Sequence, residues 1–328
     1  MGRIEAFFAV LILALMLTMI VTGCSDNTCK PVICGPKPTL ENIWPNDDQR
    51  FWEYDYTVRG WSGGLYDTLY ETEGEVPPAP SFDYIEDLLE NHPVGEDVNT
   101  SSGTYRMKFD GDSTSDYGVT AQALKDTVYL DGLAVSRDKA ASARDVILGL
   151  AMPVDQTMSS LLLGSMRAED TFPSYPLLIH GGFWEKNDAW IGTYCEIDTN
   201  LCWKFLEEDL EPGHEFTHQL VPGISDKAFL QCKVLSIGNV EIGGQLYPNA
   251  LECVYIVDYG AYQFTSTGGA SIGWGRTYDY GVVVYAPQAG PLYSYERSLV
   301  EAGNDASTGV GDKTLILEDT GTPATTYP

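Results

Sequence analysis

The stretch AFLQCKVLSIGNVEIGGQLYPNALECVYIVDYGAYQF, residues 228–264, decides the fold class of this chain. It contains two long runs rich in Val, Ile, Leu and Tyr, the residues that strands favour. The dipeptide Gly243-Gly244 joins the two runs. Two strand-like runs joined through two glycines predict a β-hairpin.

Similar runs fill the chain from Tyr175 onward, and the links between them are short and carry Gly, Pro, Asn or Asp. A series of this kind predicts an antiparallel meander, so we expect a mainly β protein with two or three short helices. The further runs are LLIHGGFWEK (177–186), AWIGTYCEI (189–197), LCWKFL (201–206), YDYGVVVYAP (278–287) and PLYSYERSLV (291–300).

Three segments carry helix signals. Residues 81–92, SFDYIEDLLENH, begin with Ser81 as a candidate N-cap and have apolar residues at helical spacing. The segment SRDKAASARDVILGLAM, residues 136–152, predicts a longer helix that ends before Pro153, and DQTMSSLLLGSM, residues 155–166, is a further candidate.

The amino terminus has the pattern of a secretory signal. Residues 6–22, AFFAVLILALMLTMIVT, are uncharged and mostly apolar, and they are short for a membrane span. Val21-Thr22-Gly23-Cys24 resembles a bacterial lipobox, which implies cleavage before Cys24 and lipidation of its sulfur and new amino group. Several acyl chains on one residue give stable anchoring. The alternatives are a plain signal peptide cut nearby and an uncut membrane anchor.

These features divide the chain into four parts. Residues 1–23 are the expected signal peptide, and 24–42 are the lipidated Cys and a Pro-rich tether. Residues 43–301 form one β-rich domain, and the small, polar segment 302–328 is a partly disordered tail. Because Ser25 follows the anchor Cys in place of an Asp, we expect the outer membrane, with the domain facing the periplasm or the cell surface.

The formal net charge of −28 bears on possible partners. Such a surface repels the phosphates of nucleic acids and offers no basic patch to anionic lipid headgroups. We therefore expect no nucleic-acid partner, and contact with the membrane through the lipid anchor alone.

Six cysteines remain if Cys24 is lipidated, and an even number outside the cytoplasm suggests disulfides. The spacing pairs neighbours. The hairpin-like YCEIDTNLCW pairs Cys195 with Cys202, the two runs of 228–264 pair Cys232 with Cys253, and a short loop in the tether pairs Cys29 with Cys34. The competing idea, a zinc site at Cys24, Cys29 and Cys34, lacks the spacing of zinc ribbons.

PGHEFTHQLVPG, residues 212–223, contains His214, Glu215 and His218 in the H-E-x-x-H order of zinc peptidases. That chemistry needs a helix, on which both imidazoles reach one Zn²⁺ and the Glu activates its water. Only eight residues separate two Pro-Gly pairs here, which favours a strand. The two His would then lie about 13 Å apart. The sequence therefore predicts no catalytic or metal-binding residue, with Glu215 as base and both His as zinc ligands as the alternative.

Three further patterns in the sequence are weaker. The G-x-S-x-G match at 269–273 lacks the following helix of a nucleophile elbow. The acidic run DGDSTSDYG, with Asp110, Asp112 and Asp116, predicts a hairpin turn, and an incidental Ca²⁺ site is the alternative. Seven tryptophans are either core residues or the floor of a sugar or lipid site: Trp44, Trp52, Trp61, Trp184, Trp190, Trp203 and Trp274.

Three segments, IWPNDDQRFWEYDY, KVLSIGNVEIGGQLYPNALECVYI and VVYAPQAGPLYSYE, resemble motifs of the TapB-like group of uncharacterised bacterial lipoproteins. They run in that group's order from Ile43 to Glu296. Asn46-Asp47-Asp48-Gln49 departs from the usual Leu and Gly of the first motif, and Pro248-Asn249-Ala250 from the usual Pro-Ala-Gly of the second. The resemblance implies a curved antiparallel sheet akin to the half-barrels of lipoprotein carriers, and it carries no catalytic residues.

The sequence thus predicts a lipid-anchored envelope protein. We expect this protein to bind a partner or to have a structural role, and we do not expect it to be an enzyme. Its expected partner is an apolar ligand, such as a lipid or a lipoprotein acyl chain, or an envelope protein. Two alternatives stay open, a zinc metallopeptidase acting through HEFTH and an envelope glycan-binding protein.

Overall fold

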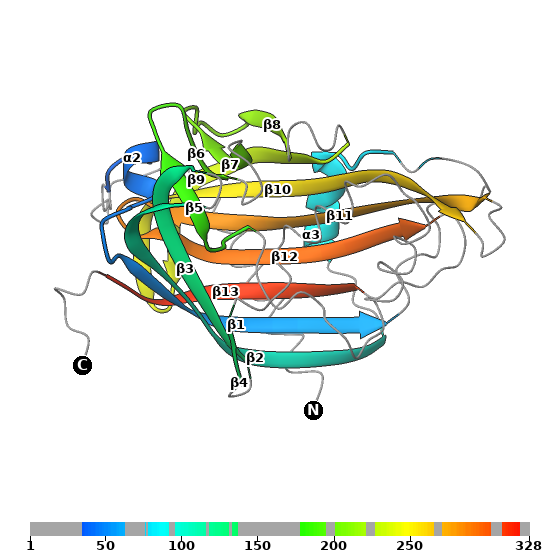
Figure 1. Ribbon diagram of the computed structural model, residues 1–328, viewed down its shortest axis with the longest axis horizontal. Helices are drawn as coiled ribbons and strands as arrows, with labels where there is room; N and C mark the ends of the chain where they lie inside the picture. The colour runs from blue at the N-terminus through cyan, green and yellow to red at the C-terminus, as the bar shows by residue number, and fades with distance from the viewer. Residues whose placement is uncertain are drawn as a thin grey trace, which may run out of the picture.

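The computed structural model describes residues 35–62, 76, 78–91, 96–115, 118–130, 133–136, 178–194, 201–220, 227–265, 271–302 and 310–321. Within them the chain forms one antiparallel sheet of thirteen strands, with order β7-β6-β5-β3-β2-β1-β13-β12-β11-β10-β9-β8 and with β4 paired to β3. The sheet curves strongly, so that β3 and β5 cross in front of β10 to β13 in Figure 1. The fold class expected from the sequence, a mainly β, half-barrel-like sheet, is confirmed.

The strands have these bounds: β1 Phe51–Ser62, β2 Glu96–Thr114, β3 Thr120–Leu130, β4 Leu133–Ser136, β5 Gly182–Lys186, β6 Trp190–Tyr194, β7 Leu201–Glu207, β8 Glu215–Gln219, β9 Phe229–Ile242, β10 Gln245–Thr265, β11 Ser271–Ala286, β12 Gly290–Ala302 and β13 Val310–Gly321.

The predicted hairpin of residues 228–264 is strands β9 and β10. Gly243 and Gly244 both have positive φ, 60° and 77°, as the two central residues of a type I′ turn require. Along the first half of β9, buried residues alternate with partly exposed ones. The buried residues, Leu230, Cys232 and Val234, face the interior. β10 is apolar on both faces because both of its faces are covered.

Helix α3, Phe82–Asn91, covers the outer face of the sheet behind β10 and β11 (Figure 1). Ser81 caps it as expected, since its Oγ accepts a hydrogen bond from the Tyr84 amide at 3.3 Å. Ile85 is fully buried against four side chains of β10 and β11, Val254, Ile256, Tyr278 and Tyr280. The two longer helix candidates at 136–152 and 155–166 lie outside the described residues, apart from Ser136 at the end of β4.

Two segments differ from the expected domain boundaries. The stretch assigned to the tether contains helix α2, Leu40–Ile43, whose Leu40 and Ile43 are buried. Lys186 of β5 donates to the carbonyl oxygens of Glu41 and Trp44, each at 3.0 Å, which satisfies the carbonyl end of that helix. The capping box and these bonds stabilise a short helix within the Pro-rich stretch, and its apolar side chains pack against one end of the sheet.

The stretch expected to be a polar tail contains β13, which lies between β1 and β12 in the middle of the sheet. Leu315 and Leu317 of this strand enter the core, while Ile316 between them is exposed. The boundary at residue 301 was therefore wrong, because the final strand completes the sheet by pairing with the first strand of the domain.

Candidate functional site

The HEFTH segment is extended. Gly213, with φ of 91°, ends the preceding turn, and β8 begins at Glu215 and pairs antiparallel with β9, Phe216 opposite Cys232. The preference for a strand over a helix is therefore correct. His214, Phe216 and His218 share one face of the strand, and Glu215 lies on the other face, exposed, 3.8 Å from the ammonium of Lys233.

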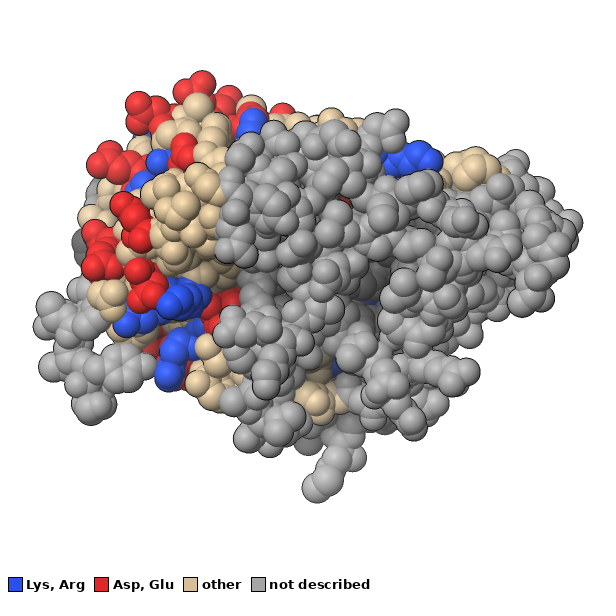
Figure 2. All heavy atoms as spheres, in the orientation of Figure 1, with Lys and Arg blue, Asp and Glu red and all other residues tan. Residues whose placement is uncertain are grey.

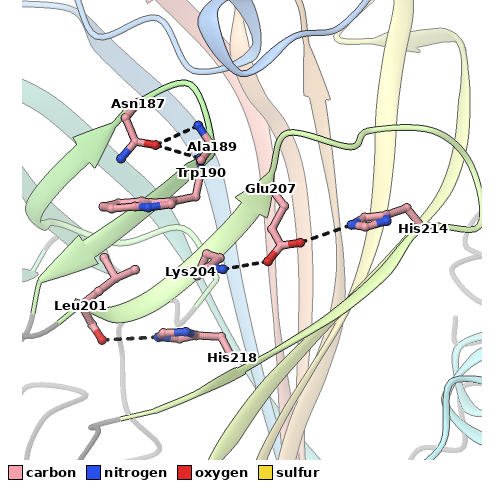
Figure 3. Close-up of polar contacts among 8 residues, drawn as sticks. All are labelled: Asn187, Ala189, Trp190, Leu201, Lys204, Glu207, His214 and His218. Atoms are coloured by element: carbon pink, nitrogen blue, oxygen red, sulfur yellow. Dashed lines mark hydrogen bonds and ion pairs between the residues drawn. The ribbon is translucent and has the colours of Figure 1, made fainter.

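The two imidazoles have separate partners on β7 and in the turn that follows it (Figure 3). His214 lies between two carboxylates, with Nε2 3.4 Å from Glu207 Oε2 and Nδ1 3.3 Å from Asp209 Oδ2. His218 Nε2 is 3.3 Å from the carbonyl oxygen of Leu201. Among the described residues no three His, Cys, Asp or Glu side chains come together as metal ligands. The alternative zinc site at His214, Glu215 and His218 is thus not assembled, because an extended backbone spreads the three residues along a strand and over both of its faces.

What the two histidines do instead is bridge the place where the sheet closes on itself. β7 and β8 are the two ends of the strand order, and in the described residues no backbone pairing joins them. Side chains span the gap, which we call the seam. His218 caps Leu201 O, Tyr255 of β10 donates its hydroxyl to Phe205 O at 2.8 Å, and Lys204 lies 6.0 Å from the centre of the Phe216 ring.

Tyr255 remains a donor at any physiological pH. Burial raises the pKa of its phenol well above the usual value, and the nearby Cys232 and Tyr285 raise this pKa further. Its one proton is donated to Phe205 O, so the neutral hydroxyl accepts a hydrogen bond from the hydroxyl of Tyr285 at 3.1 Å. A side chain of β10, two strands from β8 in the strand order, thus bonds to the backbone of β7.

Beneath the seam the inner face carries a wall of stacked aromatic rings. Trp203 and Phe205 of β7 are stacked with centroids 5.8 Å apart, Phe205 stacks on Trp184 at 5.0 Å, and Trp184 stacks on Trp44 at 4.3 Å. All four side chains are at most 4% exposed. Four of the seven tryptophans considered as a ligand floor are therefore inner-face residues: Trp44, Trp52, Trp184 and Trp203.

A short segment before β5 crosses this interior and is held by two carboxylates, of which Glu296 is buried and Asp126 is partly buried. Glu296 of β12 accepts a hydrogen bond from the Leu178 amide at 2.6 Å. Asp126 of β3 accepts from the Gly181 amide and from the Tyr105 hydroxyl, each at 2.8 Å. Sequence reasoning missed both carboxylates, because each lies in a strand that also carries other polar residues.

On the outer face of β5 and β6, polar groups surround Trp190, which is half-buried. Asn187 Oδ1 accepts from the amides of Ala189 and Trp190 at 2.9 and 3.0 Å (Figure 3). Asn187 Nδ2 donates to Glu185 at 3.3 Å, and Glu185 also accepts the hydroxyl of Tyr194. Burial and this bond raise the pKa of Tyr194 to about 12.

The cysteine predictions have different outcomes. Cys24, Cys29, Cys34 and Cys195 lie outside the described residues. Cys202 is in β7. Cys232 and Cys253 are both free, buried thiols, so the disulfide expected between them is not formed. The register accounts for this, because Cys253 lies opposite Val234 while Cys232 lies opposite Tyr255, which places the two cysteines on a diagonal.

The remaining motifs belong to hairpins. Ser271 and Gly273 of the G-x-S-x-G match open strand β11, with no helix after them, and Gly269 and Ala270 lie outside the described residues. Asp110 and Asp112 lie in strand β2 of the β2–β3 hairpin, where Asp110 forms an ion pair with Lys125. Asp116 is not among the described residues.

Acidic residues number 47 against 19 Lys and Arg. In Figure 2 the described surface at the end of the molecule where α2 lies carries many carboxylates, with a few basic side chains among them. No helix in the described part of the chain has the length and apolar character needed to cross a membrane. Comparison of the chain with protein-family models, curated proteins and solved structures gave no match.

Proposed function

We propose that this protein is a non-enzymatic binding module of the bacterial cell envelope, which holds an apolar ligand against the inner face of its sheet. The observation that carries the proposal is the wall of stacked rings, Trp44, Trp184, Phe205 and Trp203, behind a seam that side chains bridge in the described part of the chain. Apolar ligands bind to surfaces lined mainly by aromatic and aliphatic groups, with few polar ones.

The proposal places the domain outside the cytoplasm, held by the lipidated Cys24. The lipobox-like Val21-Thr22-Gly23-Cys24 and the resemblance to TapB-like lipoproteins support this location. We expect Cys24→Ala to move the protein from the membrane fraction to the soluble fraction. An unchanged membrane fraction would refute the anchor.

A non-catalytic role is favoured over the zinc peptidase because the residues of the motif are occupied elsewhere. His214 contacts Glu207 and Asp209, and His218 contacts Leu201 O, so these imidazoles bridge the seam. Glu215 points away from both. The same segment therefore contributes to closing the sheet that would hold the ligand.

The binding proposal is tested with the mature protein and a fluorescent fatty acid whose emission rises in an apolar environment. We expect saturable binding that an unlabelled fatty acid displaces. Trp203→Leu should weaken binding, because it removes a stacked ring from the inner wall. Trp190→Leu, which changes a tryptophan on the outer face of the same hairpin, should leave binding unchanged. Equal effects of the two substitutions, or no saturable binding, would sink the proposal.

One observation favours glycan binding as a second candidate function. Trp190 presents part of its indole on the outer face, and Glu185, Asn187 and Tyr194 beside it are already fixed by mutual hydrogen bonds. An aromatic ring flanked by preorganised polar groups suits stacking against a sugar ring. Pull-down of the protein on cell-wall glycan tests this, with loss of retention in Trp190→Leu and none in Trp203→Leu.

A further inference from the structure

The hairpin of β9 and β10 extends beyond the strand that follows it. Leu251 is the first residue of β10 that pairs with β11, so the residues before it in β10 have only β9 as a partner strand. The turn lies close to the end of β13, since a Cβ on Gly243 would be 3.6 Å from the carbonyl oxygen of Leu317. We call residues 243–250 the hairpin tip.

The chain that comes from the expected lipid anchor joins the domain at this tip. The side-chain amide of Asn249 donates to the carbonyl oxygens of Gly35 at 2.7 Å and Pro36 at 3.2 Å. A Cβ on Gly35 would lie 2.5 Å from a ring carbon of Pro248, so glycine permits this close approach. Cys24 precedes Gly35 by eleven residues, and a chain of that length spans about 36–40 Å at most. An anchor at Cys24 would therefore keep the tip within that distance of the bilayer.

The tip is an uncharged part of a strongly acidic chain. Residues 242–251, IGGQLYPNAL, contain no charged side chain, although the formal net charge of the whole chain is −28. Leu246 is 43% exposed, one of only four large apolar side chains that are exposed among the described residues. Tyr247 beside it packs against the core and holds the strand in place. An apolar side chain on an uncharged tip can enter the headgroup region of a bilayer without the cost of desolvating a charge.

Carboxylates at the same end of the molecule restrict the kind of lipid. Helix α2 lies at this end too, because Gln288 in the turn between β11 and β12 donates its amide to Asn42 O. Glu41, Asp47 and Asp48 near the helix are exposed, and Figure 2 shows many carboxylates there. Anionic headgroups would repel these side chains, whereas zwitterionic headgroups carry no net charge to do so.

We propose that the hairpin tip is a second membrane contact besides the lipid anchor, in which Leu246 enters the headgroup region of a zwitterionic bilayer and turns the α2 end of the sheet toward it. This inference rests on the anchor of the proposed function. A single side chain binds a bilayer weakly. The anchor, however, holds the tip at a high effective concentration near the lipid, so a weak contact is enough to orient the domain.

The test uses the protein purified from membranes and reconstituted into phosphatidylcholine vesicles with or without brominated acyl chains, which quench tryptophan on contact. Leu246→Trp places a reporter at the tip. Its matched control is Tyr129→Trp, because Tyr129 has a similar exposure, 39%. It lies seven residues along β3 from Gln122, which contacts Asn46 near α2. The control is therefore roughly 23 Å away from that end of the sheet.

Flotation of the protein with the vesicles is measured first, and quenching second. We expect both variants to float, and brominated lipid to remove most of the emission added at position 246 and little of that added at position 129. If both float but the two positions are quenched equally, or neither is quenched, the tip contact is wrong and the anchor stands. If neither variant floats, the anchor fails and the tip contact fails with it. Phosphatidylglycerol vesicles should give less quenching at position 246, and equal quenching there would overturn the preference for zwitterionic lipid.

Discussion

Gly281 of β11 is the position in the sheet where we expect an added methyl group to lower the free energy of unfolding most. A Cβ built there would lie 2.0 Å from the carbonyl oxygen of Tyr295 and 3.0 Å from the Cα of Glu296, both backbone atoms of β12. Since real Cβ atoms stay beyond 3.0 Å of such atoms, β12 would have to move by about 1 Å. A shift of that size breaks the hydrogen bonds that flank the contact.

The cost can be estimated from these terms. Two lost backbone bonds and the overpacking together destabilise by about 3–5 kcal/mol. The lower entropy of the unfolded chain with Ala offsets about 0.4–1 kcal/mol of this. We expect Gly281→Ala to lower the free energy of unfolding by about 2–4 kcal/mol, and Tm by about 3–7 °C for a domain of this size. Glu296 would move with β12, so its bond to the Leu178 amide should weaken as well.

Gly238 of β9 provides the control, because a Cβ there would meet nothing within 4 Å and the residue has no positive φ. Gly238→Ala should be neutral or slightly stabilising in the same urea and thermal unfolding experiments. If the two variants differ by less than about 1 kcal/mol, β11 and β12 do not approach as closely as described here, and the placement of Glu296 must be revised.

Three further predictions concern charge and metal binding. Tyr194 should titrate near pH 12 in the tyrosinate ultraviolet spectrum, because burial and its bond to Glu185 favour the neutral phenol; this contribution to stability is complete below pH 10 and is lost as pH rises through 12, and Glu185→Gln should lower the titration midpoint. Asp312→Asn should cost about 1–3 kcal/mol in urea unfolding, since it weakens the hydrogen bonds that the buried Asp312 carboxylate accepts from Arg59 and Tyr295, whereas Asp110→Asn at an exposed ion pair should leave the unfolding curve nearly unchanged. His214→Ala should leave the zinc content of the purified protein unchanged in elemental analysis, and stoichiometric zinc lost in that variant would revive the peptidase alternative.

The parts of the fold that could be predicted are those in which the local pattern decides. The hairpin of residues 228–264 has two long apolar runs and a turn that only glycines fit well, so its strands and its connection both follow from sequence. Helix α3 has its N-cap at Ser81 and one apolar face, and Ile85 in that face is buried as its position implies. Neither element depends on distant residues for its identity.

β13 could not be predicted in the same way. Its residues are small or polar except for the run TLILE at 314–318, and composition alone favoured a frayed tail. The strand is ordered by its partners, because it lies between β1 and β12 and inserts Leu315 and Leu317 into the core. Pairing between strands more than 200 residues apart leaves no mark in the local sequence.

The expected Cys232–Cys253 disulfide failed for a different reason. Both cysteines are on adjacent strands and face inward, as the sequence implied. With Gln245 opposite Ile242 beside the turn, the register of the hairpin places Cys253 opposite Val234, two residues from Cys232, and the two register shifts farther along the hairpin cancel each other. The turn therefore fixes the register, and a pairing argued from the strands without counting residues from the turn identifies the strands but not the residues that face each other.

The HEFTH segment combines both situations. Its strand conformation follows from the flanking Pro-Gly pairs, a local property, and that part could be predicted. The contacts of the two histidines could not be predicted, because they depend on distant residues. β7 is the last strand at the other end of the strand order, and its Leu201 O and Glu207 face β8. An edge strand needs donors for its carbonyl groups, and His218 of β8 and Tyr255 of β10 supply two of them. Histidines four residues apart suit this bridging as well as they suit zinc, since on a strand they share a face and reach two separate places along a neighbour. The spacing that suggests catalysis is therefore the spacing that closes the sheet, and the backbone conformation decides between the two.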